Sequence, residues 1–238
     1  MSKQSMRVFA WGCLTVLALG GVVAWIGPEV IRQHQDRLLY DVADHLRLVA
    51  FSMALALATG MPAGIALSRP CMRRWADRLM QVFNVGNTVP SLAVLALALA
   101  VLGIGERPAI LALWLASLLP IVRNTYEGLR TVSPTLLEAA RGIGMTPGQR
   151  LLRVELPNAL PVMLAGIRIS LVINVGTVPL SFLIGANSLG DLIFPGIYLN
   201  NQSLLLLGAA ATALLALALD ALFAGAGNLY LRRRGLAR

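Results

Sequence analysis

Long runs without a charged residue constrain this chain more than any other feature of its sequence. The runs 8–28 and 48–68 each hold 21 residues. A helix that rises about 1.5 Å per residue would carry either run across about 30 Å of hydrocarbon. With 57% hydrophobic and 13% charged residues, the whole chain is too apolar for an ordinary soluble domain and belongs in a bilayer.

We therefore predict an all-α polytopic membrane protein with about six transmembrane helices in one domain, residues 8–231. A cytoplasmic N-terminus, 1–7, precedes this domain, and a basic cytoplasmic tail, 232–238, follows it. No internal repeat and no linker divides the chain. The expected spans are 8–28, 46–68, 79–104, 107–127, 163–187 and 203–224.

The first span has a competing interpretation as a signal peptide. Val22, Val23 and Ala24 could form a cleavage site. The apolar run is, however, longer than the roughly 7 to 15 residues of a typical signal-peptide core, so we expect a retained helix.

The basic residues indicate the orientation in the membrane. The net charge of +9 lies between the apolar runs and forms no stripe interleaved with aromatic side chains, so nucleic-acid binding is not predicted. With the N-terminus inside, only Arg32, Arg37, Arg47 and Arg107 of the 20 basic residues fall outside. Both termini and the polar segment 133–157 are then cytoplasmic.

The segment 133–157 carries the signals of two short, capped helices joined tightly. A side-chain oxygen at an N-cap, a proline in the first turn and a glycine after the last turn are typical helix boundaries. The expected boundaries are Ser133 and Pro134 at the start of the first helix, Gly142 and Gly144 at its end, a Thr146–Gln149 capping box at the start of the second, and Pro157 at its end.

The chain lacks the residues for nucleotide or metal chemistry. Lys3 is the only lysine and follows no glycine-rich segment, so no phosphate-binding loop exists and ATP hydrolysis would need a partner. Cys13 and Cys71 stand in no metal-ligand spacing. We expect a chain that is not an enzyme and binds no metal.

Polar and helix-breaking residues interrupt two of the expected spans. Such groups are tolerated at membrane depth where they face protein or water, so they are candidates for a translocation path. Helix–helix packing is the alternative for each of them. The candidates are Asn87, Thr88, Pro90 and Ser91 in the third span, and Asn174, Thr177 and Pro179 in the fifth.

Four charged or polar residues, Arg123, Asn124, Glu127 and Arg168, are expected to anchor the cytoplasmic ends of the helices. Asp220 is a lone carboxylate near the inner end of the last span. We expect it to pair with a partner such as an arginine and not to relay protons.

The spacing of Glu138-Ala139-Ala140, Gly144 and Val154-x-Leu156-Pro157 resembles the EAA loop of the membrane subunits of ABC importers. This resemblance implies the type I importer permease fold in a bacterial inner membrane. In that family the loop docks on a separate ATPase, so two ATPase subunits would bind ATP and Mg while this chain holds no cofactor. It also implies a second permease copy or paralogue and an extracytoplasmic substrate-binding protein. The residues expected to couple to the ATPase are Leu137, Glu138, Ala139, Ala140, Gly142, Gly144, Leu156 and Pro157.

Further segments, 88–93, 119–126, 164–168 and 191–194, resemble the osmoprotectant branch, which imports glycine betaine, choline, carnitine or similar quaternary amines. Asn87, Pro179 and the pair Asn187-Ser188 depart from that branch. Two alternatives remain open: a permease for another small solute such as an amino acid, and an ion-driven secondary transporter. The lack of paired mid-membrane carboxylates disfavours the latter.

Overall fold

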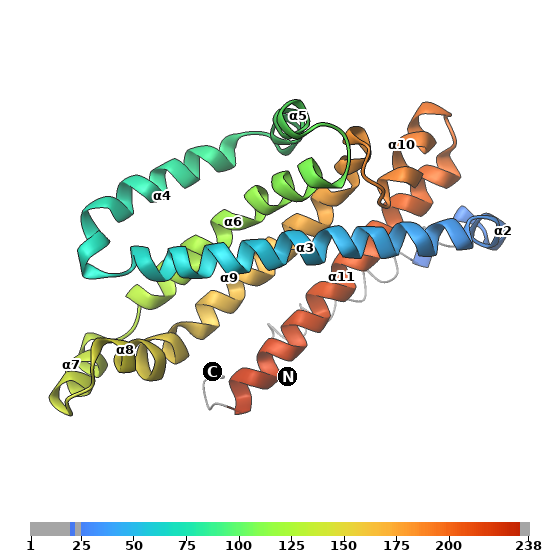
Figure 1. Cartoon of the computed structure of the whole chain (residues 1–238). Helices are drawn as coiled ribbons and strands as arrows, with labels where there is room; N and C mark the ends of the chain where they lie inside the picture. The colour runs from blue at the N-terminus through green and yellow to red at the C-terminus, as the bar shows by residue number, and fades with distance from the viewer. Residues whose placement is uncertain (1–19, 22–24, 234–238) are drawn as a thin grey trace.

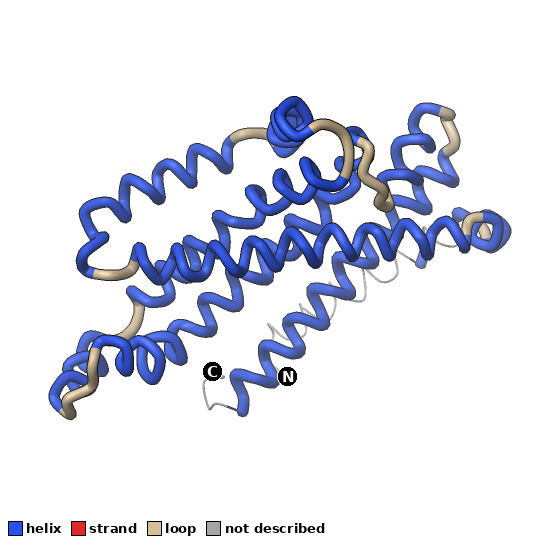
Figure 2. The backbone as a smooth tube through the Cα atoms, in the orientation of Figure 1, coloured by secondary structure: helices blue, strands red, loops and turns tan. Residues whose placement is uncertain are grey.

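The computed structural model describes residues 20–21 and 25–233, apart from some side chains between 73 and 87. Most of the expected first span, 8–28, lies outside the described residues. Every regular element in the described part is helical (Figure 2), which confirms the predicted fold class. The elements are α2 (Pro28–Gln33), α3 (Gln35–Leu67), η1 (Pro70–Met72), α4 (Arg73–Thr88), α5 (Ser91–Leu102), α6 (Glu106–Arg130), α7 (Pro134–Gly142), α8 (Pro147–Arg150), η2 (Leu151–Glu155), α9 (Leu156–Thr177), η3 (Val178–Ile184), α10 (Gly190–Tyr198) and α11 (Gln202–Arg233).

Four stretches of helix in the described part are long and apolar enough to cross a membrane. They are 35–67, 106–130, 147–184 and 202–233. The expected third span, 79–104, is instead two helices, α4 and α5, separated at Val89 and Pro90. Val89 is extended, with φ −69° and ψ 124°, because the ring of a proline disfavours the helical conformation of the preceding residue.

Helix α6 is the centre of the bundle, with α3 packed on one side and α9 on the other. Glycines allow both neighbours to approach its backbone. A Cβ at Gly64 of α3 would lie 2.6 Å from Cβ of Thr125, and one at Gly166 of α9 would lie 2.7 Å from the carbonyl oxygen of Pro120. Small residues at such crossings increase dispersion contact between helices, which drives association where lipid replaces water.

The central apolar core lies between α3, α5, α6, α9 and η3. Helix α10 folds back on α11 and closes a second, smaller core. The buried residues of the central core are Leu48, Val49, Met53, Ala56, Leu95, Ala98, Ala109, Ala112, Leu113, Ile121, Ile167, Val175, Val178, Ile184 and Ala186.

The bundle has two different ends. Helices α7 and α8 project from one end, which we call the loop end, whereas α2 and α10 lie at the other, which we call the α10 end (Figure 1). The C-terminal ends of α3 and α6 and the N-terminal end of α9 meet at the loop end. The segment 133–157 is therefore a projection built on three of the long helices.

Candidate functional site

Helix α7 is the first part of the projecting segment, and its two ends differ from each other in how they are capped. Ser133 is the N-cap residue as predicted, with Pro134 in the first turn, but its side chain makes no capping hydrogen bond. Its backbone carbonyl accepts instead from the amides of Leu136 and Leu137 at 3.1 and 3.2 Å. The predicted boundary is correct, whereas the predicted side-chain cap is wrong.

The C-terminal end of α7 is a Schellman motif centred on Gly144. The Gly144 amide donates to the carbonyl of Arg141 at 2.9 Å, and the Met145 amide donates to that of Ala140 at 3.1 Å. This pattern places residue 144 in the left-handed region, at φ +79°. Glycine is the residue that adopts this conformation without steric cost.

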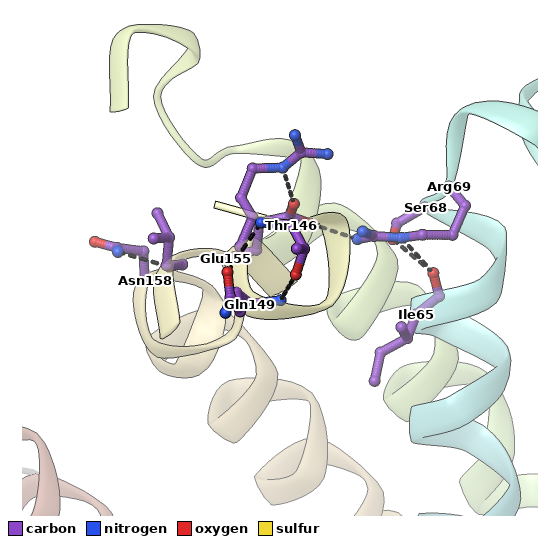
Figure 3. Close-up of polar contacts among 9 residues, drawn as sticks. Ile65, Ser68, Arg69, Thr146, Gln149, Glu155 and Asn158 are labelled. Atoms are coloured by element: carbon purple, nitrogen blue, oxygen red, sulfur yellow. Dashed lines mark hydrogen bonds and ion pairs between the residues drawn. The ribbon is translucent and has the colours of Figure 1, made fainter. Parts of the chain in front are cut away.

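The second helix opens with the predicted capping box. The Gln149 amide donates to Oγ1 of Thr146 at 3.3 Å, and the Thr146 amide donates to Oε1 of Gln149 at 3.0 Å (Figure 3). Both bonds satisfy amides that lack a partner at a helix start.

Pro157 does not end this helix, contrary to the prediction. The chain passes through the π-helical turn η2 and continues as α9, with Pro157 in the first turn of α9. A proline removes one amide from the hydrogen-bond ladder, and a wider π turn accommodates the change in register. The Asn158 side chain donates to the carbonyl of Val154 at 2.8 Å, which satisfies one carbonyl in this irregular turn.

The residues expected to couple to an ATPase separate into an exposed group and a covered group. Glu138, Ala139, Gly142 and Gly144 are exposed, and Ile143 beside them is 75% exposed. No ion pair involves Glu138 within the described part of the chain. The covered group consists of Leu137, Ala140, Leu156 and Pro157.

The covered group belongs to the base of the projection. Leu137 and Leu156 pack against a buried cluster that joins α6 to α9, and Met61 and Ile65 of α3 pack on the same cluster. Partial burial of Leu137 and Leu156 fixes α7 against the bundle, and each contributes a part of the roughly 1.5 to 3 kcal/mol that full burial of such a side chain gives. The buried residues of this cluster are Leu129, Val132, Ala159 and Met163.

Sequence reasoning missed one charged residue in this segment, Glu155. Its side chain is only 7% exposed and accepts from Arg69 Nη2 at 2.6 Å and from Arg150 Nε at 3.0 Å (Figure 3). Arg69 lies 86 residues earlier in the chain. The available signal was a single carboxylate between apolar residues just before Leu156 and Pro157, which by itself does not identify its partner.

The path candidates of the third span lie at the break between α4 and α5. Thr88 and Pro90 are exposed and Ser91 is half-buried. The Thr88 hydroxyl donates to the carbonyl of Val85 at 2.7 Å, within its own helix. Asn87 lies in α4, but its side chain is outside the described part.

Asn174 occupies a different environment, inside the bundle. Its fully buried side chain donates to Ser52 of α3 at 2.9 Å and to Ser117 of α6 at 2.7 Å. The Ser170 hydroxyl donates to the carbonyl of Ser117 at 2.6 Å. These bonds join α3, α6 and α9, an arrangement that the helix-packing alternative for Asn174 predicts.

The other two candidates of the fifth span lie where α9 changes into η3. Pro179 is buried, and Thr177 is half-buried with its hydroxyl bonded to the carbonyl of Ile173 at 2.7 Å. The six candidates whose side chains are described are therefore not brought together into one polar site within this part of the chain. They occupy the α4–α5 break, the interior of the bundle and the start of η3.

Asp220 pairs with Arg168, as predicted. Two parallel hydrogen bonds join the groups, one of them from Nη2 to Oδ2 at 2.5 Å. The pair lies in a cavity of about 540 Å³ between α9 and α11. Within the described residues, no group of three His, Cys, Asp or Glu side chains could hold a metal ion.

The described part of the chain is an all-helical bundle with four candidate membrane spans and a projecting, capped loop, which defines the class of polytopic membrane proteins. Residues 60–234 match the family model described as "Binding-protein-dependent transport system inner membrane component". The chain therefore belongs to this family of inner-membrane transport components, as the resemblance implied.

Comparisons with individual proteins describe its similarity in more detail. It is 59% identical over 222 residues to the osmoprotectant import permease protein OsmY of Salmonella typhimurium, covering 93% of this chain and 94% of that protein. It is 39% identical over 192 residues to the choline transport system permease protein OpuBB of Bacillus subtilis, covering 81% and 88%. The structure of the MetNI methionine ABC transporter, in an inward-facing conformation, has a chain that matches with a TM-score of 0.71 and 24% identity, covering 87% of this chain and 99% of that one. The last likeness shows the fold, which is that of an ABC transporter permease.

Proposed function

We propose that this chain is the permease subunit of an ATP-driven importer of quaternary-amine osmoprotectants such as glycine betaine, choline or carnitine. The observation that carries the substrate class is the 59% identity to an osmoprotectant import permease over nearly the whole of both chains. A second relative from Bacillus subtilis, 40% identical over 80% of this chain, is named for glycine betaine, carnitine and choline.

The energy for transport comes from separate ATPase subunits that bind the loop end. The exposed group on α7 supports this role, because Ala139 and Gly142 permit close approach and Glu138 is exposed, with no ion pair to any described residue, so it can meet a basic side chain of the partner. Two copies of the permease, or this chain and a paralogue, would receive two ATPases. ATP and Mg are bound by those partners.

The loop end faces the cytoplasm in this proposal, together with both termini. Arg69, Arg130, Arg141, Arg150 and Arg153 belong to the loop end, in agreement with the excess of basic residues on the cytoplasmic side of membrane proteins. The α10 end then faces outward and receives the substrate-binding protein.

Substrate selection takes place mainly in that extracytoplasmic protein. Quaternary ammonium groups are recognised by clusters of aromatic rings, and aromatic residues make up only 6% of this chain. The permease therefore supplies the path and the coupling, while its partner supplies affinity.

The test is uptake of radiolabelled glycine betaine, choline, carnitine and methionine in a strain that lacks this chain, with and without the chain restored. Uptake of at least one quaternary amine should depend on the chain and on ATP. Uptake of methionine alone would favour an amino-acid permease. Uptake that follows an ion gradient without ATP would refute the ABC mechanism for this chain.

A further inference from the structure

The carboxylate of Glu155 is the only acidic group in the described part of the chain that two arginines contact at once. Each arginine takes one oxygen: Arg69 binds Oε2 and Arg150 binds Oε1. Arg150 belongs to the projection itself, five residues earlier. Arg69 belongs to a different part of the bundle, so the carboxylate joins two segments.

Arg69 holds the joint between α3 and α4. It follows Ser68, the C-cap residue of α3, and its Nε donates to the carbonyl of Ile65 at 3.3 Å. Its Nη2 donates to the hydroxyl of Ser68 at 2.9 Å (Figure 3). These bonds cap the last turn of α3 and fix the guanidinium, so a force on Glu155 acts on this helix end.

The position of Arg69 matters because α4 begins four residues later and leads to the α4–α5 break. That break carries Thr88, Pro90 and Ser91, the exposed or half-buried path candidates. The projection is covalently attached to α6 and α9, but not to α3 or α4. Two kinds of contact connect the projection to this part of the bundle. Met61 and Ile65 of α3 pack on its apolar base, and Arg69 at the α3–α4 joint pairs with Glu155.

A buried ion pair adds little to the free energy of unfolding, because desolvation of the charges offsets much of their attraction. Apolar residues of similar volume would hold the projection as well. A carboxylate shared by two planar guanidinium groups does specify one relative geometry of the segments that carry them.

We propose that Glu155 is a positioning residue that ties the projection to the α3–α4 joint, so that movement of the loop by an ATPase is transmitted to α4. This inference rests on the proposed function. The exposed face of α7 binds the ATPase, and the Glu155–Arg69 contact passes the displacement to the end of α3 and, through the short turn that follows, to the start of α4.

The test compares two matched variants, Arg69→Gln and Arg150→Gln, in the full complex of permease, ATPase and binding protein in proteoliposomes. Each removes one of the two arginines of Glu155 by the same chemical change, but only Arg69→Gln cuts the link to α3. Glu127→Gln is the control, because Glu127 forms an exposed pair with Arg123 within α6. Co-purification of the ATPase, ATP hydrolysis and uptake of the transported amine are measured for each.

Arg69→Gln should retain the ATPase and its hydrolysis but lower uptake per ATP by about tenfold, within the range typical of coupling between sites. Arg150→Gln and Glu127→Gln should keep a ratio of uptake to ATP hydrolysis near that of the wild type. Arg69→Lys, which keeps the charge but not the planar fork, should fall between them, and it carries the test should Arg69→Gln not insert.

Equal ratios of uptake to ATP hydrolysis in Arg69→Gln and Arg150→Gln would overturn the inference, since Glu155 would then stabilise the loop without linking it to α3. Loss of ATPase binding in Arg69→Gln would overturn it as well. A wild-type complex without ATP-dependent uptake would instead overturn the proposed function and the inference with it.

Discussion

Gly144 offers the sharpest test of how the projecting helix is built. It occupies the left-handed position of the Schellman motif, at φ +79°, while Gly142 is the last residue of α7 with ordinary helical geometry. A Cβ at either position would meet nothing within 4 Å. Replacing each glycine in turn with alanine therefore changes backbone preference alone, with no steric conflict.

The two substitutions should have opposite effects on the local stability of α7. An alanine at 144 must adopt the left-handed conformation at a cost of about 1 to 2 kcal/mol. An alanine at 142 should gain up to about 1 kcal/mol, because glycine is the poorer helix former. A loss of one to two kcal/mol changes an opening equilibrium by a factor of about 5 to 30.

Hydrogen–deuterium exchange on the permease alone in lipid nanodiscs measures this difference. In Gly144→Ala, the amides at the end of α7, including those of Ile143 and Met145, should exchange about 5 to 30 times faster than in the wild type. In Gly142→Ala they should exchange at the same rate or more slowly. Equal acceleration in both variants, or unchanged exchange in Gly144→Ala, would refute the assignment of this turn.

Three further predictions concern the bundle and the exposed face of α7. Gly64→Ala should lower stability against thermal unfolding in detergent by about 1 to 3 kcal/mol, because the added Cβ would meet Thr125 and the Val122 carbonyl. Gly176→Ala is the control and should not lower stability in this way, because a Cβ there meets nothing within 4 Å. Asn174→Ala should lose about 1 to 2 kcal/mol of stability, because its bonds to Ser52 of α3 and Ser117 of α6 are removed, and should leave KM for uptake unchanged. An altered KM with unchanged stability would instead mark a path residue. Glu138→Arg should weaken binding of the ATPase by about 2 to 5 kcal/mol in a normally inserted chain, measured by co-purification, and undiminished binding would contradict the docking role.

The helix boundaries of the projection could largely be predicted from sequence, because they depend on local backbone chemistry. A capping box is complete within four residues, so Thr146 and Gln149 were sufficient to identify it. The left-handed turn at Gly144 is likewise encoded by one residue and its neighbours. The prediction for Pro157 failed because the chain compensates for the missing amide with a π turn and the Asn158 side chain, which no propensity reveals.

The environment of a polar residue could not be predicted in the same way. Asn174 and Thr88 both interrupt apolar spans, yet one is fully buried and the other exposed. The difference arises from Ser52, which lies 122 residues before Asn174, and from Ser117. Polarity in a span indicates that a partner exists, but the partner is set by how the helices pack.

The two acidic residues of the projection differ in the same respect: the surroundings of one could be predicted from sequence, and those of the other could not. Glu138 stands in a recognisable motif and is exposed, while Glu155 is buried and pairs with Arg69, which follows the end of α3.

The different surroundings of the two residues predict different defects when each is changed. A change at Glu138 should alter how tightly the ATPase binds, since that side chain faces outward. A change at the contact between Glu155 and Arg69 should leave binding intact and alter the yield of transport, because the contact lies between the loop and the bundle. We therefore expect binding and transmission to be separable in this chain, along the boundary between the exposed face of α7 and its base.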